Sequence, residues 1–348
     1  MKRRLFLGLA CSSLAMFLSC SKSPSGTAVV PKGGSGELKI TFISNNAHEF
    51  WKLAELGVKQ AEKDLGVKTE FRMPAKGSAD EQRQIIEDLI TQGCKHFAVS
   101  PNDPENQGEF YDAKIKEGIS IITVDNDLLA GSKRLCFIGT SNFEAGRSAG
   151  ELVKKAVPAG GKVVIFVGKL DNMNAPQRRN GVIAALAGLK TSAEADALVK
   201  KGYPITAGPY QILDTLTDNA EIPKCKANAE DMMTKHPDVA CMVGLWAYNA
   251  PQILLAAKDQ KLMGKLKIVS FDEQKETLDA IRAGEMVGTI VQQPYEFGYQ
   301  SVKTLATIAQ GKKPEIPADG NIFVPHKVIE KGNVDEFEKK LNELRGKK

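Results

Sequence analysis

Aromatic, carboxylate and amide side chains recur at one kind of position in this sequence, directly after short apolar runs that are predicted to be β-strands. Both tryptophans of the chain, Trp51 and Trp246, are among them, although aromatic residues make up only 6% of the sequence. In open sheets of parallel strands, ligands bind outside the carboxyl ends of the strands. We therefore treat these residues as one candidate binding site. The candidates are Asn46, His48, Phe50, Trp51, Asp125, Asn126, Arg178, Trp246, Asn249, Asp272 and Gln292.

The chemistry that this set could do is non-covalent recognition of a sugar or a related polyol. A sugar ring has apolar C–H faces, which flat aromatic rings match at about 0.5–1.5 kcal/mol each beyond burial. It also has a rim of hydroxyls, and a hydroxyl that donates to a buried carboxylate contributes roughly 1.5–3 kcal/mol. A simpler interpretation makes Phe50 a core residue, Trp51 the cover of a helix flank, and each Asp a helix cap. The shared position of the whole set favours the binding site.

Arg178 lies in the loop and first helical turn after the predicted strand at residues 162–167. Its guanidinium could hold two sugar oxygens or one aspartate of the site. Its neighbour Arg179 is expected on the surface. We expect Trp51→Ala and Asp272→Ala each to weaken sugar binding at least about tenfold, or ~1.4 kcal/mol, and to leave the melting curve of the ligand-free protein near that of the wild type.

The elements that must position these residues alternate between strands and helices. Apolar residues at helical spacing fill residues 50–65, and Gly66 ends that helix. Ser78 followed by Glu81 predicts a capping box at the next helix. This alternation is typical of βαβ units, and so many strands fit an α/β fold of two doubly wound parallel-sheet lobes. The predicted strands are Leu38–Ile43, Val67–Met73, His96–Ser100, Ile119–Val124, Leu135–Ile138, Lys162–Val167, Ile212–Thr217, Val239–Leu245, Leu266–Phe271 and Val287–Val291.

The first residues of the chain predict export. Lys2, Arg3 and Arg4 precede an uncharged, largely apolar run that ends at Leu18, and such a run is too short to span a bilayer. Residues 1–19 are therefore predicted to be a signal peptide. Cys20 resembles the lipidated cysteine of bacterial lipoproteins, because a polar stretch rich in Ser, Pro and Gly follows it. Residues 20–37 are predicted to be a flexible linker.

Composition narrows the classes of partner. The chain has 348 residues, and removing Lys2, Arg3 and Arg4 with the signal peptide lowers its formal net charge from +5 to +2. A nearly neutral chain with mixed charges has no electrostatic footprint for nucleic acid. No CxxC motif or Cys/His cluster is present, so no metal site is predicted. The remaining cysteines are expected to be buried thiols, with a Cys225–Cys241 disulfide left open.

An ordered set of motifs brings the chain close to a family. The motifs are Phe50-Trp51 with Gly57, Asp80 and Gln82 before Ile85, Ser100-Pro101-Asn102-Asp103, Thr123-Val124-Asp125, Ile138-Gly139-Thr140-Ser141-Asn142, Arg178 with Gly181, His236-Pro237-Asp238-Val239, Phe271-Asp272, and Gln292 with Pro294. By these motifs the sequence, from about residue 38 to residue 328, resembles the periplasmic type I solute-binding proteins of sugar ABC transporters, in particular the ribose-binding group.

The resemblance implies roles for the candidate residues. Phe50 and Trp51 would sandwich or flank the sugar ring, and Asn46 and His48 compete for the polar contact before them. Asp125 and Asn126 would bind hydroxyls from the first lobe. The second lobe would close over the sugar with Arg178, Trp246, Asp272 and Gln292. Asn126 stands where ribose binders carry an arginine and Trp246 where they carry an asparagine, so a sugar is implied but not ribose.

The resemblance also implies an organisation and partners. Residues 38–141 with 293–321 would form the N-terminal lobe and residues 142–292 with 322–332 the C-terminal lobe, followed by a helix and basic tail at residues 333–348. Three crossings, near Ser141, Gln292 and Asn321, would form a hinge. The expected partners are a monosaccharide or related polyol and the permease subunits of an ABC transporter. No cofactor is expected, the protein is expected to be a monomer, and a lipid anchor would be its only link to the membrane.

Other functions fit the sequence less well than sugar binding. Residues 146–150 match the GxSxG motif of hydrolases, but Ser148 falls inside a helix that starts near Asn142, where small residues let the helix lie close to the sheet. Residues 125–127 lack the later oxygen ligands of a calcium loop. A repressor of the same fold would need a helix-turn-helix in place of the export signal. A periplasmic sugar receptor for chemotaxis or a sensor kinase remains the alternative function, because its binding chemistry would be identical.

Overall fold

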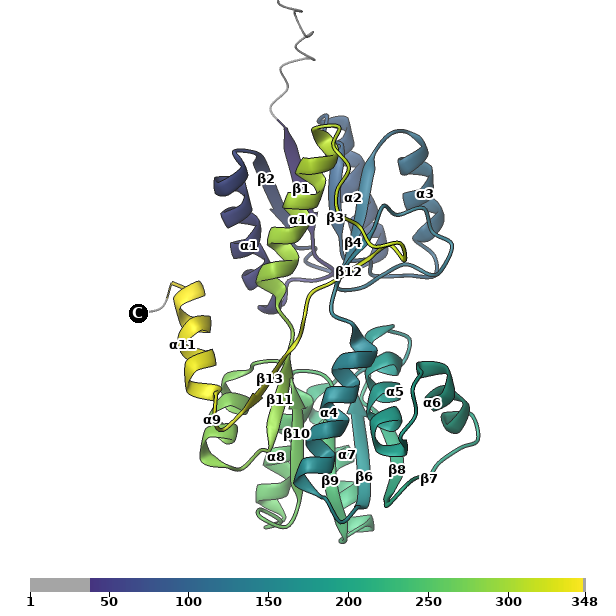
Figure 1. Cartoon of the computed structure of the whole chain (residues 1–348), viewed down its shortest axis with the longest axis vertical. Coiled ribbons are helices and arrows are strands. Elements are labelled where there is room, and N and C mark those ends of the chain that lie inside the picture. Colours follow the sequence, from purple (N-terminus) through teal and green to yellow (C-terminus); the bar gives the residue numbers. More distant parts are fainter. Residues whose placement is uncertain (1–37, 347–348) are drawn as a thin grey trace, which may run out of the picture. The chain divides into compact units, whose positions relative to one another are not determined.

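The computed structural model describes residues 38–346. The predicted signal peptide, Cys20 and the linker lie outside the described residues. Residues 38–346 belong to one compact unit, which holds two separate β-sheets. The two doubly wound parallel-sheet lobes predicted from the sequence are confirmed (Figure 1).

The first sheet has six parallel strands in the order β12-β5-β4-β3-β1-β2. The order reverses beside β1, as in other doubly wound sheets. β12 at one edge comes from a distant part of the chain and was not predicted. The strands are β1 (Lys39–Ile43), β2 (Lys68–Arg72), β3 (His96–Val99), β4 (Ser120–Val124), β5 (Phe137–Gly139) and β12 (Asn321–Phe323).

The second sheet has seven strands in the order β13-β11-β10-β9-β6-β8-β7. Its five central strands are parallel, and the edge strands β7 and β13 are antiparallel to their neighbours. Neither edge strand, Ile205–Ala207 or Lys327–Glu330, was predicted. The strands are β6 (Gly161–Val167), β7 (Ile205–Ala207), β8 (Tyr210–Thr217), β9 (Val239–Gly244), β10 (Lys267–Phe271), β11 (Gly288–Val291) and β13 (Lys327–Glu330).

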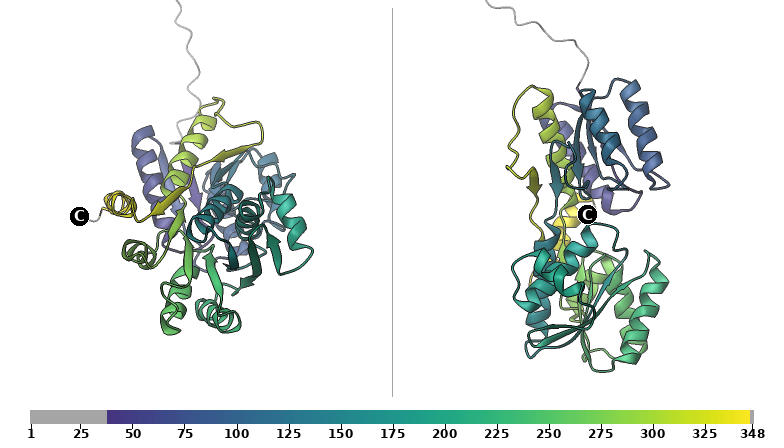
Figure 2. Two further views of the ribbon diagram at one scale, coloured as in Figure 1. Left: turned by 60° about the horizontal axis from the view of Figure 1, so that its bottom comes forward. Right: turned by 90° about the vertical axis from the view of Figure 1, so that its right-hand side faces the viewer.

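Helices cover both faces of each sheet (Figure 2). Gly66 ends the first helix in the left-handed conformation, as predicted. Ser78 caps the second, but the Glu81 carboxylate accepts from the backbone of Ala75 and Lys76, so only half of the capping box forms. The helices are α1 (Phe50–Leu65), α2 (Ala79–Thr91), α3 (Gly108–Lys116), α4 (Asn142–Ala156), α5 (Asn174–Ala187), α6 (Ser192–Val199), α7 (Ile222–Lys235), α8 (Asn249–Asp259), α9 (Lys275–Ala283), α10 (Pro294–Ala309) and α11 (Val334–Leu344).

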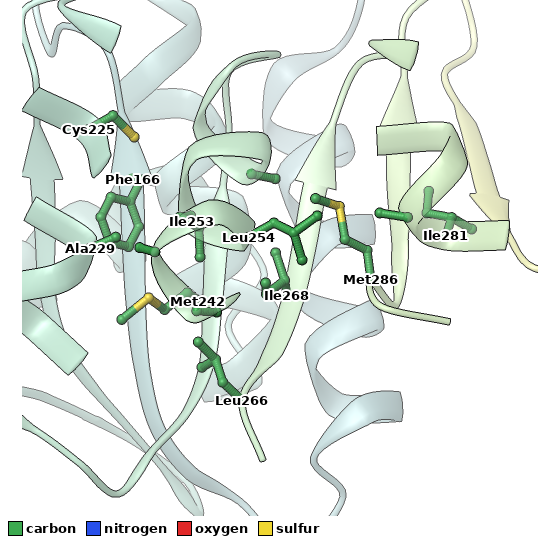
Figure 3. Packing of buried hydrophobic residues seen from close by; sticks show 14 of the residues in the cluster. Phe166, Cys225, Ala229, Met242, Ile253, Leu254, Leu266, Ile268, Ile281 and Met286 are labelled. Atoms are coloured by element: carbon green, nitrogen blue, oxygen red, sulfur yellow. The ribbon is translucent and has the colours of Figure 1, made fainter. Parts of the chain in front are cut away.

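Burial of both sheet faces explains the continuous apolar strands of the sequence. On one face of the second sheet, Phe166, Met242 and Ile268 pack against α7 and α8 (Figure 3). On the opposite face, Val163 and Val243 pack against α4 and α5. The helices packed on the two faces hold the strands in place. They thereby also hold the loops that follow the carboxyl ends of the strands.

The chain passes between the sheets three times. It leaves β5 for α4 at Thr140–Ser141, leaves β11 for α10 at Gln292–Gln293, and leaves β12 for β13. The third passage corrects the boundary that we placed between residues 321 and 322. β12 pairs with β5 through Phe323, so strand pairing keeps those residues in the first sheet and moves the passage beyond them.

The four cysteines of the described part of the chain are buried free thiols. Cys225 on α7 and Cys241 on β9 belong to hydrophobic clusters on opposite faces of the second sheet, so they do not form a disulfide. Among the helices of residues 38–346, none has the length and apolar character needed to cross a membrane.

Candidate functional site

A cavity of about 1360 Å³ is lined by residues that follow the carboxyl ends of strands in both sheets. Its size exceeds the 300–1,000 Å³ of ordinary ligand pockets. Most of the predicted candidates meet here, although they come from segments as far apart in the sequence as Asn46 and Gln292. Those that line the cavity are Asn46, His48, Phe50, Trp51, Asp125, Arg178, Trp246, Asp272 and Gln292.

The loop after β1 is held by its own polar side chains. Asn46 Oδ1 accepts a hydrogen bond from the backbone N–H of His48 at 2.8 Å, and His48 Nδ1 accepts from that of Phe50 at 3.2 Å. Both polar residues are exposed and therefore reachable by a ligand. Phe50 at the start of α1 is half-buried and shows part of its ring to the cavity.

Trp51 differs from the expectation drawn from its sequence position. Only 2% of the residue is exposed, and its ring packs against Phe42 at a centroid distance of 5.9 Å and edge-on against Phe50 at 5.1 Å. Its indole N–H donates to Asn45 Oδ1 at 3.0 Å. The expectation that Trp51→Ala leaves ligand-free stability unchanged is therefore wrong, because the ring fills the core of the first sheet.

Three charged groups form the centre of the site. Asp125 follows β4, Asp272 follows β10, and Arg178 lies on the first turns of α5. Burial raises the pKa of Asp125 to about 7, the positive charge of Arg178 opposes the rise, and the negative charge of Asp272 adds to it. Burial likewise raises the pKa of Asp272 against the charge of Arg178. Both aspartates have positive φ, 63° and 64°, in the left-handed region that Asp and Asn tolerate best.

Arg178 is fixed by contacts on several sides. Its Nε donates to Asn142 Oδ1 at 2.9 Å, its Nη1 donates to the carbonyl oxygen of Leu245 at 3.0 Å, and its guanidinium lies 3.9 Å from the ring centre of Phe271. These partners hold the charge in place before any ligand arrives. Arg179 is also buried, at 7% exposure, and pairs with Asp196, so its predicted surface position is wrong. The partner Asp196 lies on α6, a helix that was not predicted from the sequence.

Two side chains surround Asp272. Gln292 Nε2 donates to Asp272 Oδ1 at 3.1 Å, which orients the carboxylate. The next residue, Glu273, is buried and lines the cavity, and one of its carboxyl oxygens, Oε2, has no hydrogen-bond partner. Burial, together with the charge of Asp272, raises the pKa of Glu273 to about 8. We did not predict Glu273, although its place directly after Asp272 was a usable signal.

Trp246 forms the aromatic wall of the second lobe. Its indole N–H donates to Asn174 Oδ1 at 3.1 Å, and Tyr248 packs against it edge-on at 6.3 Å. The Tyr248 hydroxyl in turn donates to the buried carboxylate of Asp218. Sequence analysis missed Asn174 and Tyr248. Tyr248 shares the segment that pointed to Trp246, and Asn174 lies in the same segment after β6 that contains Arg178.

Asn126 and Asn249 were predicted to contact ligand, and the structure places both away from the cavity lining. Asn126 is 7% exposed, and its Nδ2 donates to the carbonyl oxygen of Pro101 at 2.8 Å, which joins two loops of the first lobe. Asn249 is fully buried. It accepts from the Trp246 backbone N–H at 2.8 Å and donates to Asp218 at 3.1 Å. Internal hydrogen bonds thus hold the Asn126 Nδ2 and both ends of the Asn249 amide, whereas Asn126 Oδ1 has no partner. Both residues support the site rather than line it.

The rival chemistries find little support in the geometry. Within residues 38–346, no group of three or more His, Cys, Asp or Glu side chains is placed to hold a metal ion. Ser148 lies within α4, where its Oγ is 2.8 Å from His326 Nε2, and neither residue lines the cavity. We expected the small residues of the GxSxG match to face the sheet. Gly146 and Gly150 instead face α5.

The chain is similar to known proteins of one family. Residues 40–313 match the model of the periplasmic binding protein domain. The chain is 23% identical over 338 residues to the D-ribose/D-allose-binding protein of Pseudomonas aeruginosa, covering 94% of this chain and 97% of that protein. It is 25% identical over 282 residues to the ribose import binding protein RbsB of Escherichia coli, with 79% of this chain and 86% of that protein covered.

Solved structures agree with the fold. A solute-binding protein of an ABC transporter from Burkholderia graminis, crystallised with D-arabinose, superimposes with a TM-score of 0.75 at 25% identity, covering 86% of this chain and 98% of that one. The residues that match the family model, 40–313, include strands of both sheets, β2 to β11, and the strand ends that line the cavity. The chain therefore belongs to the periplasmic binding protein domain family and has its type I fold, that of a solute-binding protein and not of an enzyme.

Proposed function

We propose that the protein captures a monosaccharide or a related polyol in this cavity and delivers it to the permease of an ABC importer. The observation that carries the proposal is the group formed by Asp125, Arg178 and Asp272, in which two half-buried carboxylates line the cavity within the electrostatic influence of one guanidinium. Sugar hydroxyls would donate to the carboxylates. The names of the relatives, which bind ribose, allose or arabinose, agree with this chemistry.

Binding would proceed without any bond being made or broken. Phe50 and Trp246 would cover the C–H faces of the ring from the two lobes. Each hydroxyl that donates to Asp125 or Asp272 stabilises the ionised carboxylate, so ligand binding would lower both pKa values. Gln292, which already orients Asp272, would donate its remaining N–H to a ring oxygen.

The two lobes would close on the ligand. We assign the N-terminal lobe to the first sheet with α1–α3 and α10, and the C-terminal lobe to the second sheet with α4–α9. A ligand that touches both lobes binds the closed form more tightly and shifts the population toward it by that difference in affinity. The three passages between the sheets would serve as the hinge.

A thermal-shift screen of a soluble form that starts at Ser21, without the predicted signal peptide and Cys20, tests the proposal. D-Ribose, D-allose, D-arabinose, other monosaccharides and sugar alcohols would be added one at a time, with Asp272→Ala as the control protein. We expect at least one sugar to raise the melting temperature of the wild type and to leave that of Asp272→Ala unchanged. If no sugar or polyol acts on the wild type, or if the same one acts equally on both proteins, the proposed site is wrong.

We further propose that the protein works in the periplasm or cell envelope as a monomer tethered through lipidated Cys20. Because one acyl chain alone anchors only weakly, stable attachment requires more than one. Cys20→Ser would then move the protein from the membrane fraction to the soluble fraction after osmotic lysis. A Cys11→Ser variant is the matched control, because Cys11 lies inside the predicted signal peptide. An unchanged distribution of Cys20→Ser would contradict the tether.

A further inference from the structure

Trp246 lines the cavity from the loop between β9 and α8. The residue is half-buried, unlike Trp51. On one side the ring lies against Gly168, where an added Cβ would come within 2.1 Å of it. The ring also packs against the edge of Tyr248 and against the hydrophobic cluster of the second sheet, and its Nε1 donates a hydrogen bond to Asn174 Oδ1. Because the residue borders the cavity and is only half-buried, packing encloses the ring in part, and the directional hydrogen bond can select its orientation.

We infer that Asn174 is a positioning residue, whose side-chain oxygen holds the Trp246 ring in the orientation that binds the sugar. The inference rests on the proposed function, because it assigns the control of one wall of the same site. Asn174 is the first residue of α5, the helix that also carries Arg178. One rigid helix therefore sets both the aromatic wall and the central positive charge.

The size of the effect follows from the bond. A single neutral hydrogen bond corresponds to about two- to tenfold in an equilibrium constant. Without it, the indole can adopt other side-chain rotamers, and sugar binding must first select the productive one. We expect removal of this hydrogen bond to lower sugar affinity by about two- to tenfold and to make the Trp246 ring more mobile. The positions of Asp125 and Asp272 should not change.

The chain contains only two tryptophans, so fluorescence can report each ring separately. In a Trp51→Phe background of the chain from Ser21, Trp246 is the sole emitter. Asn174→Leu keeps the approximate volume but removes the acceptor, and Asn174→Asp restores an acceptor oxygen. We expect Asn174→Leu to raise acrylamide quenching at least about twofold and to lower the anisotropy of Trp246, and Asn174→Asp to restore both values.

Affinity is the second measurement. Calorimetry with D-ribose, D-allose and D-arabinose should show Asn174→Leu about two- to tenfold weaker than the wild type, with Asn174→Asp close to it. Trp246→Phe lacks the indole donor, so adding Asn174→Leu to it should cause no further loss. If Asn174→Leu loses its cooperative melting transition, Asn174→Ala takes its place.

Asn45 supplies a matched control, because it makes the same bond to Trp51 at 3.0 Å. Trp51 is enclosed by aromatic side chains, so Asn45→Leu in a Trp246→Phe background should leave the anisotropy of Trp51 unchanged. The inference is overturned if Asn174→Leu behaves as wild type in quenching or affinity, or if Asn174→Asp fails to rescue it. If the wild type binds none of the three sugars, the proposed function loses support, and the quenching result still decides the role of Asn174.

Discussion

Asp125 and Asp127 lie two residues apart, and their carboxylates should have opposite effects on the stability of the ligand-free protein. Asp125 lines the cavity, and the positive charge of Arg178 offsets only part of the cost of burying its carboxylate. Its pKa in the folded protein is about 7, against an ordinary value near 3.9. Between these values the folded protein binds a proton that the unfolded chain does not, so the stability contributed by this group falls as pH rises from about 4 to 7. Asp127 instead accepts hydrogen bonds from Arg134 and Thr123.

Asp125→Asn should therefore stabilise the ligand-free protein at pH 8 and change it little at pH 4, while sugar binding is lost at both. Asparagine also tolerates the positive φ of this position. Asp127→Asn should lower the melting temperature at pH 8, because it weakens the pairing of Arg134. Thermal melts of both variants at the two pH values check this. A destabilised Asp125→Asn at pH 8 would show that the carboxylate is better compensated than its surroundings indicate.

Phe50 and Trp51 are adjacent, yet their truncation should have different consequences. Trp51→Ala should destabilise the protein by about 3–5 kcal/mol, the usual cost of deleting a fully buried aromatic side chain. Phe50→Ala removes a half-buried ring and should lower sugar affinity with a smaller loss of stability. Urea unfolding and calorimetry on both variants separate the two effects. Equal loss of stability in the two variants would contradict this assignment.

At the scale of elements, α4 and α5 approach each other so closely that glycine is required at their crossing. A Cβ at Gly146 would lie 2.1 Å from the carbonyl oxygen of Arg178, and one at Gly181 would lie 2.2 Å from that of Phe143. The small residues that resemble a hydrolase motif thus position the helix that carries Arg178 and Asn174.

Gly146→Ala should push α5 away and cost at least about 1–3 kcal/mol of stability, as overpacking does, with a parallel loss of sugar affinity as Arg178 moves. Gly108→Ala is the matched control. A Cβ at Gly108, the first residue of α3, meets nothing within 4 Å, so this variant should keep both stability and affinity. Thermal melts and calorimetry measure the two properties. A Gly146→Ala protein with wild-type affinity would show that Arg178 tolerates the shift.

At the scale of the whole molecule, binding should appear as added stability, because a ligand that contacts both lobes binds only the folded chain. At a sugar concentration of 100 times Kd, the free energy of unfolding should rise by about 2.7 kcal/mol and continue to rise with the logarithm of concentration. Chemical denaturation at several sugar concentrations measures this. Ser148→Ala should show the same rise, because Ser148 lies outside the cavity lining, and a lost response in this variant would revive the hydrolase interpretation.

The sequence predicted those site residues whose place is determined by the end of a strand. Asp125 and Asp272 were found because each directly follows a buried parallel strand, and parallel strands deliver their carboxyl ends to one edge. Asn126 and Asn249 satisfy the same rule but turn inward, to Pro101 and to Asp218. Sequence position cannot separate these cases, because a side chain beside a strand end can point either to the cavity or to the protein.

The sequence by itself determined the α/β class, the two lobes and most of the strand-end candidates, since these follow from local periodicity and from the order of elements along the chain. Only the tertiary structure decided that Trp51 is core and Trp246 is wall, that Arg179 is covered, and that Asn174 holds an indole. Each of those outcomes depends on contacts between segments distant in sequence, and the direction of a side chain is set by the neighbours that fill the space around it.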